Sequence, residues 1–275
     1  MNPLHAFFRP AQGKSRSDWL FVLPSLILLA LFGLPLLAIL WRSLGDGFFQ
    51  HAFEPAALAA LRLSLLASSL STLLSVAAGM PLAYILAHWK FRGKTALELL
   101  VDLPVVLPPS VAGLALLIAF GRQGIFGRGL ALLGIQLPFT TAAVVLAQIF
   151  VAAPLFVRSA RTGFSEIDPQ LEEAAYVEGA GDVQLLWHVM LPMAWRSLLA
   201  GVILTWTRTL GEFGATILFA GNLPGRTQTM PLAIYLGLER DLGVALALSM
   251  LLVFVSLVLL GTLRRLEKKN RSLTA

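Results

Sequence analysis

Six long apolar runs constrain the fold of this chain more than any other feature of its sequence. An α-helix needs about 20 mostly apolar residues to cross the hydrocarbon core of a bilayer, and each run meets or approaches that length. Backbone groups in lipid must bond within their own segment, so the runs are predicted to be transmembrane helices of an all-α membrane protein. They cover residues 19–41, 58–87, 97–120, 141–157, 197–220 and 242–263.

The composition supports a bilayer as the solvent of this chain. Hydrophobic residues make up 57% of it and charged residues 13%, whereas a soluble domain carries about 25% charged residues. The net charge of +6 would suit nucleic acid, but the basic residues gather at the ends of the apolar runs, where lipid headgroups explain them better. There are no cysteines, which excludes disulfides and cysteine-ligated metals.

The distribution of lysine and arginine predicts the orientation. Of 21 such residues, 14 lie in the two terminal tails and in the loops after the second and fourth runs, and five lie in the other loops. An excess of these residues marks the cytoplasmic side of a membrane protein. We therefore expect cytoplasmic tails at 1–18 and 264–275. The transmembrane domain is then 19–263, with a cytoplasmic loop at about 159–195.

Two of the runs carry a packing pattern. Small residues recur every four positions in the second run and let helices approach closely in lipid, although they can also be lipid-facing filler. The third run contains three prolines, which kink a helix. Such a break must be covered by protein or line a cavity, so this run is expected to face the bundle interior. The positions are Ser64, Ser68, Thr72, Ser71, Ser75 and Gly79, then Pro104, Pro108 and Pro109.

The loop at 159–195 is predicted to form two short helices. Asp168 is a good N-cap, and Pro169 suits the first position of a helix. Two glutamates follow in or near the first turn, where the helix dipole favours negative charge. Gly179 then bends the chain.

The second short helix is expected to start at Asp182 as its N-cap and to end at Pro192. Its apolar residues recur at helical spacing and predict one buried stripe. From this pattern alone, an amphipathic hairpin lying on the membrane and a protein-docking loop remain equally open. The stripe comprises Val183, Leu186, Trp187 and Met190.

The same loop resembles the signature of permease subunits of ATP-binding-cassette (ABC) importers. The resemblance implies the MetI-like fold of type I importers, with about six transmembrane helices and a coupling helix that turns at Gly179. It also implies docking on a separate cytoplasmic ATPase subunit, pairing with a second permease copy, a periplasmic binding protein and a place in the bacterial inner membrane. The matching positions are Glu173, Ala174, Ala175, Gly179, Ala180, Leu191 and Pro192, with Val189 where the family often has isoleucine.

Further segments resemble the oxyanion permeases of this family. Residues 103–109 (LPVVLPP) are similar to their proline-rich third span, and residues 211–216 (GEFGAT) occur in the molybdate and sulfate branches. Residues 220–229 (AGNLPGRTQT) are most similar to the molybdate branch. The resemblance therefore implies molybdate as cargo, with sulfate, thiosulfate or tungstate as the alternative.

Two charges fall inside the fifth run. Arg208 and Glu212 are four residues apart, which places them on one face of a helix. Charges at bilayer depth are costly and usually face a bundle interior or water. They can form a structural pair or line the path of an anion. Possible polar neighbours on that path are Ser110, Thr205 and Thr209.

Other functional classes find little support in the sequence. The segments Gly13-Lys14-Ser15 and Gly93-Lys94-Thr95 lack the earlier glycine of a phosphate-binding loop, so no ATP site, cofactor or enzymatic activity is expected. The four histidines show no metal-ligand spacing. A transporter driven by an ion gradient and an intramembrane enzyme are the rival classes. The first would need proton-relay carboxylates in several spans, and the second would need paired catalytic residues.

Overall fold

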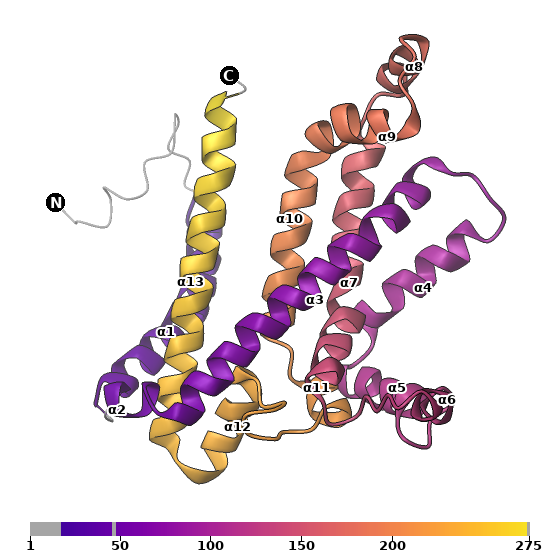
Figure 1. The fold of residues 1–275 in the computed structure, drawn as a ribbon. Coiled ribbons are helices and arrows are strands. Elements are labelled where there is room, and N and C mark those ends of the chain that lie inside the picture. Colours follow the sequence, from indigo (N-terminus) through magenta and orange to yellow (C-terminus); the bar gives the residue numbers. More distant parts are fainter. Residues whose placement is uncertain (1–17, 46–47, 274–275) are drawn as a thin grey trace.

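The computed structural model describes residues 18–45 and 48–273, and the regular structure within these ranges is helical throughout (Figure 1). The predicted tail at 1–18 thus lies almost wholly outside the described residues. Three long helices form the centre, where α7 packs along both α3 and α10. Their bounds are Pro55–His88 for α3, Thr141–Ser165 for α7 and Leu191–Leu210 for α10. The predicted all-α class is confirmed.

The shorter and peripheral helices surround this centre. They are α1 (Asp18–Gly45), α2 (Phe48–Ala52), α4 (Lys94–Val106), α5 (Pro109–Phe120), α6 (Gly127–Leu132), α8 (Pro169–Val177), α9 (Asp182–Leu185), α11 (Gly214–Phe219), α12 (Met230–Arg240) and α13 (Leu242–Leu273). A π-helical turn, Leu186–Met190, joins α9 to α10. Figure 1 shows α8, α9 and the C-terminal end of α13 at one end of the molecule, with α2 and α12 at the other.

Four helices among the described residues are long and apolar enough to span a bilayer. A fifth span results if α4 and α5 count as one. The last predicted run falls in α13, where Leu242–Val258 is apolar. The four helices are Leu20–Ser43, Pro55–His88, Thr141–Ser165 and Asp182–Leu210.

The small residues of α3 form its contact with the neighbouring helices. All six predicted positions are buried, so they are not lipid-facing filler. A Cβ atom at Gly79 would lie 2.9 Å from Cδ1 of Phe156 and 3.1 Å from Cγ2 of Val157, both on α7. This close approach is the packing that small residues allow between membrane helices.

The predicted proline break in the third run is confirmed and is large. Helices α4 and α5 meet at 116°. Pro104 lies inside α4, and the break falls at Leu107 and Pro108, whose backbones are extended. The residue before a proline is pushed out of the helical region, which explains the position. Protein covers α5, since a Cβ at Gly113 would lie 2.9 Å from Cα of Ala215 in α11.

The fifth predicted run, 197–220, is not one continuous helix. Helix α10 ends at Leu210, and α11 starts at Gly214. Two glycines flank the break, and glycine weakens a helix interior by its conformational freedom. Glu212 therefore lies between two helices, and its predicted place on one helical face with Arg208 is wrong.

Candidate functional site

The predicted coupling loop contains an exposed helix, α8, with a sharp turn after it. Asp168 is the N-cap, as predicted: its Oδ1 accepts a hydrogen bond from the backbone N–H of Gln170 at 3.0 Å. Pro169 occupies the first turn. Gly179 follows the helix with φ +89°, a conformation that side chains with a Cβ rarely adopt. The turn thus requires glycine at this position.

The residues of the resemblance divide between exposed and partly buried positions. Ala175 packs against the apolar cluster formed by α3, α7 and α10, so this residue anchors the helix. The partly buried members are Ala175, Ala180 and Leu191, and the exposed members are Glu173, Ala174, Gly179 and Pro192. The apolar residues Val177, Val183 and Trp187 are also 88%, 70% and 63% exposed.

The second half of the loop differs from its prediction. Gly181, not Asp182, is the N-cap of α9. Leu185 and Met190 are buried, whereas Val183 and Trp187 of the predicted stripe are exposed. The π-helical turn rotates the side chains away from simple helical spacing, and such turns often occur at functional sites.

Pro192 does not end a helix, contrary to prediction. It lies in the first turn of α10, directly after the π-helical turn. A proline is tolerated in a first turn because its missing N–H has no required partner there. The chain from Asp182 to Leu210 therefore runs on as one helical span.

Asp182 instead holds the end of α8. The hydroxyl of Tyr176 donates to Oδ1 of Asp182 at 2.9 Å. This hydrogen bond raises the pKa of Tyr176 to about 12. The contact bridges the Gly179 turn, so the start of α9 fixes the orientation of α8.

The two intramembrane charges form a close ion pair. Nη1 of Arg208 lies 2.6 Å from Oε2 of Glu212. The side chain of Glu212 is 1% exposed, and that of Arg208 is 35% exposed. Oε1 of Glu212 accepts the backbone N–H of Ala215 at 2.8 Å. Glu212 therefore stabilises the start of α11 and neutralises Arg208 at the same time.

The predicted path residues have different surroundings. Thr205 and Thr209 are fully buried, and their hydroxyls donate to backbone carbonyls. Ser110 is exposed at the start of α5. A Cβ at Gly214 would lie 3.4 Å from the backbone nitrogen of Ser110, so α5 and α11 start side by side. Ser110 and the Arg208–Glu212 pair thus belong to one region, while the two threonines lie inside the helix packing.

Gln148 is the buried residue that links this region to α3. Its Oε1 accepts the hydroxyl of Ser71 at 2.8 Å, and its Nε2 donates to the carbonyl of Thr209 at 3.1 Å. The side chain joins α3, α7 and α10. In the sequence, the signal for this role was a glutamine inside an apolar run.

Two further ion pairs join α4 to α7. Asp102 pairs with Arg158, and Glu98 pairs with Arg161 at 3.0 Å. Both pairs are partly exposed, and such pairs contribute about 0–1 kcal/mol.

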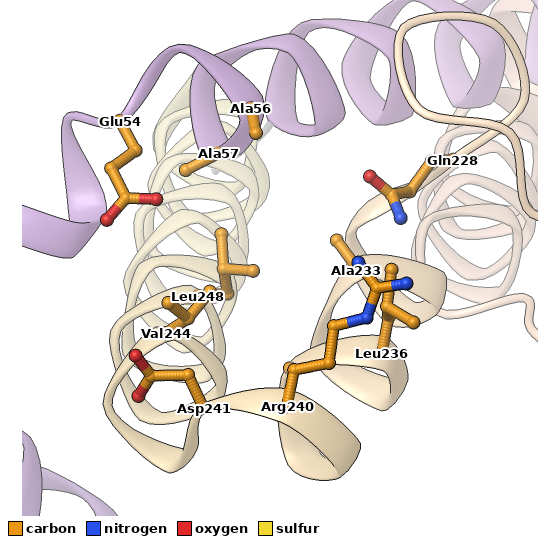
Figure 2. A pocket seen from close by; sticks show the side chains of 11 residues that line it. Glu54, Ala56, Ala57, Gln228, Ala233, Leu236, Arg240, Asp241, Val244 and Leu248 are labelled. Carbon is orange, nitrogen blue, oxygen red and sulfur yellow. The ribbon is translucent and has the colours of Figure 1, made fainter.

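A cavity of about 170 Å³ (Figure 2) lies beside α12, at the end of the molecule opposite α8 (Figure 1). Its wall comes from the starts of α3 and α13 and from α12, with Glu54, Gln228, Arg240 and Asp241 as its polar side chains. None of the predicted path residues lines it. Among the described residues, no group of three or more histidine or acidic side chains could hold a metal ion.

The fold and the site define a class: a helical membrane protein that presents an exposed helix, α8, at one end. Residues 79–272 match the family described as binding-protein-dependent transport system inner membrane component. The chain belongs to this family. Membership in this family favours a permease subunit over the two rival classes, the intramembrane enzyme and the transporter driven by an ion gradient.

Curated relatives share much of the sequence. The chain is 42% identical over 244 residues to the molybdenum transport system permease protein ModB of Mycobacterium tuberculosis, covering 88% of this chain and 92% of the relative. It is 36% identical to the probable transport system permease protein NifC of Clostridium pasteurianum, covering 92% and 91%. It is 35% identical to the sulfate transport system permease protein CysT of Salmonella typhimurium, covering 81% and 80%.

Solved structures share the fold. A chain of a bacterial ABC transporter that imports alginate matches with a TM-score of 0.73 at 19% identity, over 94% of this chain and 98% of the other. A chain of the methionine ABC transporter MetNI, in an inward-facing conformation, matches with a TM-score of 0.56 at 17% identity, over 77% and 93%. The predicted MetI-like permease fold is confirmed.

Proposed function

We propose that this chain is the permease subunit of an ABC importer that carries molybdate. The observation that carries the cargo is the 42% identity to ModB over most of both chains, against 35% to the sulfate permease. The segment at 220–229, which resembles the molybdate branch, supports the same choice. Sulfate remains the second candidate, because sulfate permeases match over four fifths of their length.

The proposed energy source lies on another chain. A cytoplasmic ATPase subunit docks on α8 and the loop around it, at about 159–195. Glu173 and Ala174 are exposed on this helix. The apolar side chain of Val177 is exposed beside them, and a bound partner would remove it from water. Both tails are cytoplasmic, as the lysine and arginine distribution predicts. The membrane is the bacterial inner membrane, as the family resemblance implies.

Transport proceeds by alternating access in a pair of permease chains. A periplasmic binding protein delivers the oxyanion. ATP binding draws the docking loops together and opens the path outward, and ATP hydrolysis returns it to the inward-facing state. An alginate importer has been solved together with its substrate-bound periplasmic protein, which supports this division of labour.

The Arg208–Glu212 pair is proposed to line the path near Ser110. A permeating anion must enter and leave, so a binding site on the path must be weak. Arg208 supplies attraction, and Glu212 limits it by holding the guanidinium at 2.6 Å. Thr205 and Thr209 are proposed to reach the path only if the helices move, because both are fully buried in this conformation.

The proposal is tested by uptake in cells with and without this chain, with labelled molybdate and sulfate supplied separately. Selective loss of molybdate uptake without the chain is the expected result. Selective loss of sulfate uptake would assign the chain to the sulfate branch and leave the ATP-driven mechanism intact. Unchanged uptake of both ions would overturn the assignment of an oxyanion cargo.

A further inference from the structure

A histidine–glutamate pair joins α8 to the transmembrane helix α3. His88 is the last residue of α3, and Glu172 lies in the first turn of α8. Nε2 of His88 lies 3.0 Å from Oε1 of Glu172, and the two side chains are 19% and 18% exposed. The contact connects residues 84 positions apart in the chain. None of the positions in the family resemblance takes part in it.

Each ring nitrogen of His88 has one hydrogen-bond partner. Nδ1 lies 3.1 Å from the carbonyl oxygen of Tyr84, one turn earlier in α3. Nε2 lies at the carboxylate of Glu172 in α8. The imidazole ring therefore links the backbone of α3 directly to a side chain of α8.

Aromatic rings hold the imidazole in place. The Tyr84 ring stacks on His88 at a centroid distance of 4.6 Å and an interplanar angle of 27°. Phe164 of α7 meets Tyr84 edge-on at 6.1 Å. With the ring fixed on one side, a displacement of Glu172 acts on the end of α3 and is not absorbed by rotation of a free side chain.

Helix α3 reaches from this contact to the rest of the molecule. Halfway along, Ser71 donates to Gln148, which also bonds the carbonyl of Thr209 close to the Arg208–Glu212 pair. Near the other end, the hydroxyl of Ser64 accepts the backbone N–H of Met230 at the start of α12. A shift of α3 would therefore move its hydrogen-bond partners in the region proposed for the anion path and at the opposite end of the molecule.

We propose that His88 and Glu172 are positioning residues that pass a displacement of α8 to α3 during the transport cycle. The inference rests on the proposed function, in which α8 docks on the ATPase. It adds the contact through which docking moves a transmembrane helix. Glu173, the neighbouring glutamate, is exposed and free to face the ATPase, while Glu172 turns inward to His88.

The first test measures uptake per ATP hydrolysed in liposomes that contain the permease, its ATPase and its binding protein. Glu172→Gln and His88→Gln should each lower this ratio by about five- to tenfold, a range typical of coupling between sites. The double variant should be no worse than either single one, because the pair acts as a unit. His51→Gln is the matched control, since it removes a His–Glu contact of the same 3.0 Å within one local segment, with Glu54. Uptake per ATP equal to wild type in both single variants overturns the inference.

The second test does not depend on transport. Amide hydrogen exchange in α8 of the full chain in detergent should be faster in Glu172→Gln and His88→Gln than in wild type, and unchanged in His51→Gln. Equal protection of α8 in all four proteins also overturns the inference. If wild type shows no ATP-driven uptake, the proposed function fails, and the exchange result still decides whether the pair holds α8.

Discussion

The packed centre of α3, α7 and α10 and the loop around α8, which we propose as the docking site, are built in opposite ways. In the centre, Phe156 is fully buried against Gly79, and Gln148 satisfies its hydrogen bonds within the chain. In the loop, Val177 is 88% exposed, and only a few contacts hold α8. The centre pairs its polar side chains within the chain, whereas the loop leaves large apolar side chains exposed. Substitutions in the two regions should therefore change different quantities: stability in the centre and coupling in the loop.

Gly179→Asp should produce the largest effect on transport. Any residue other than glycine is strained at φ +89°, although a Cβ there would meet no atom within 4 Å. ATP-dependent uptake should fall by about tenfold or more at normal abundance, in the range of typical coupling energies. Gly181→Asp is the control, because this neighbour has φ −84° and Asp is a good N-cap. Retained uptake in Gly179→Asp would contradict a role for this turn in coupling.

Gly79→Val should have the largest effect on stability. Its Cβ would lie 2.9 Å from Phe156, and overpacking of this kind costs about 1–3 kcal/mol. Thermal unfolding in detergent should show a lower midpoint and reduced abundance in cells. Ala78→Val, at the adjacent exposed position, should leave the midpoint close to wild type. Equal midpoints for the two variants would show that the contact of α3 with α7 is looser than the distances indicate.

Glu212→Gln should have an intermediate effect on transport. This residue belongs to neither of the two regions compared above. The amide retains an acceptor for the N–H of Ala215 but leaves Arg208 without its counter-charge. Molybdate uptake should fall by about fivefold at equal abundance, a moderate coupling effect. Asp102→Asn breaks a half-exposed ion pair and should change uptake much less. Normal uptake in Glu212→Gln would remove the pair from the path.

Tyr176→Phe should give the smallest effect. It removes the hydrogen bond to Asp182 but leaves the ring in place. Uptake at neutral pH should stay within about twofold of wild type, because an exposed polar contact contributes little. The raised pKa means that this contact stabilises the loop below the ordinary tyrosine pKa of about 10, and the contribution is lost as pH rises through about 12.

That shift can be measured by absorbance of the tyrosinate. Subtracting the titration of Tyr176→Phe from that of wild type isolates Tyr176. In Asp182→Asn, the pKa of Tyr176 should move down toward its ordinary value. An unshifted Tyr176 in wild type would show that the contact across the Gly179 turn is not maintained in solution.

The sequence predicts regular helices well and their interruptions less well. The length of the apolar runs and the four-residue spacing of small residues identify α3 and its buried face, because both follow directly from helix geometry. Prolines mark the break between α4 and α5, but the 116° angle depends on contacts with α11, over a hundred positions away. The break before α11 depends on glycines that flank Glu212, a weaker signal than proline.

The candidate site shows the same limit. The N-cap at Asp168 and the turn at Gly179 depend on local backbone chemistry and could be predicted. The π-helical turn before Pro192 could not, because such turns are rare and have no simple spacing. The pairing of His88 with Glu172 brings together two ordinary residues from distant helices, and only tertiary packing makes their contact visible.

The contact between Gly113 of α5 and Ala215 of α11 also has a consequence for biosynthesis. Neither α4 nor α5 is long enough to cross a bilayer alone, since 13 and 12 residues give about 20 Å and 18 Å of helix. The partner of α5 leaves the ribosome about 100 residues later, which takes roughly 5–20 s at ordinary rates of synthesis. During that interval α5 can contact α7, but its close approach to α11 is missing. The packing of the bent pair is therefore completed only when α11 arrives.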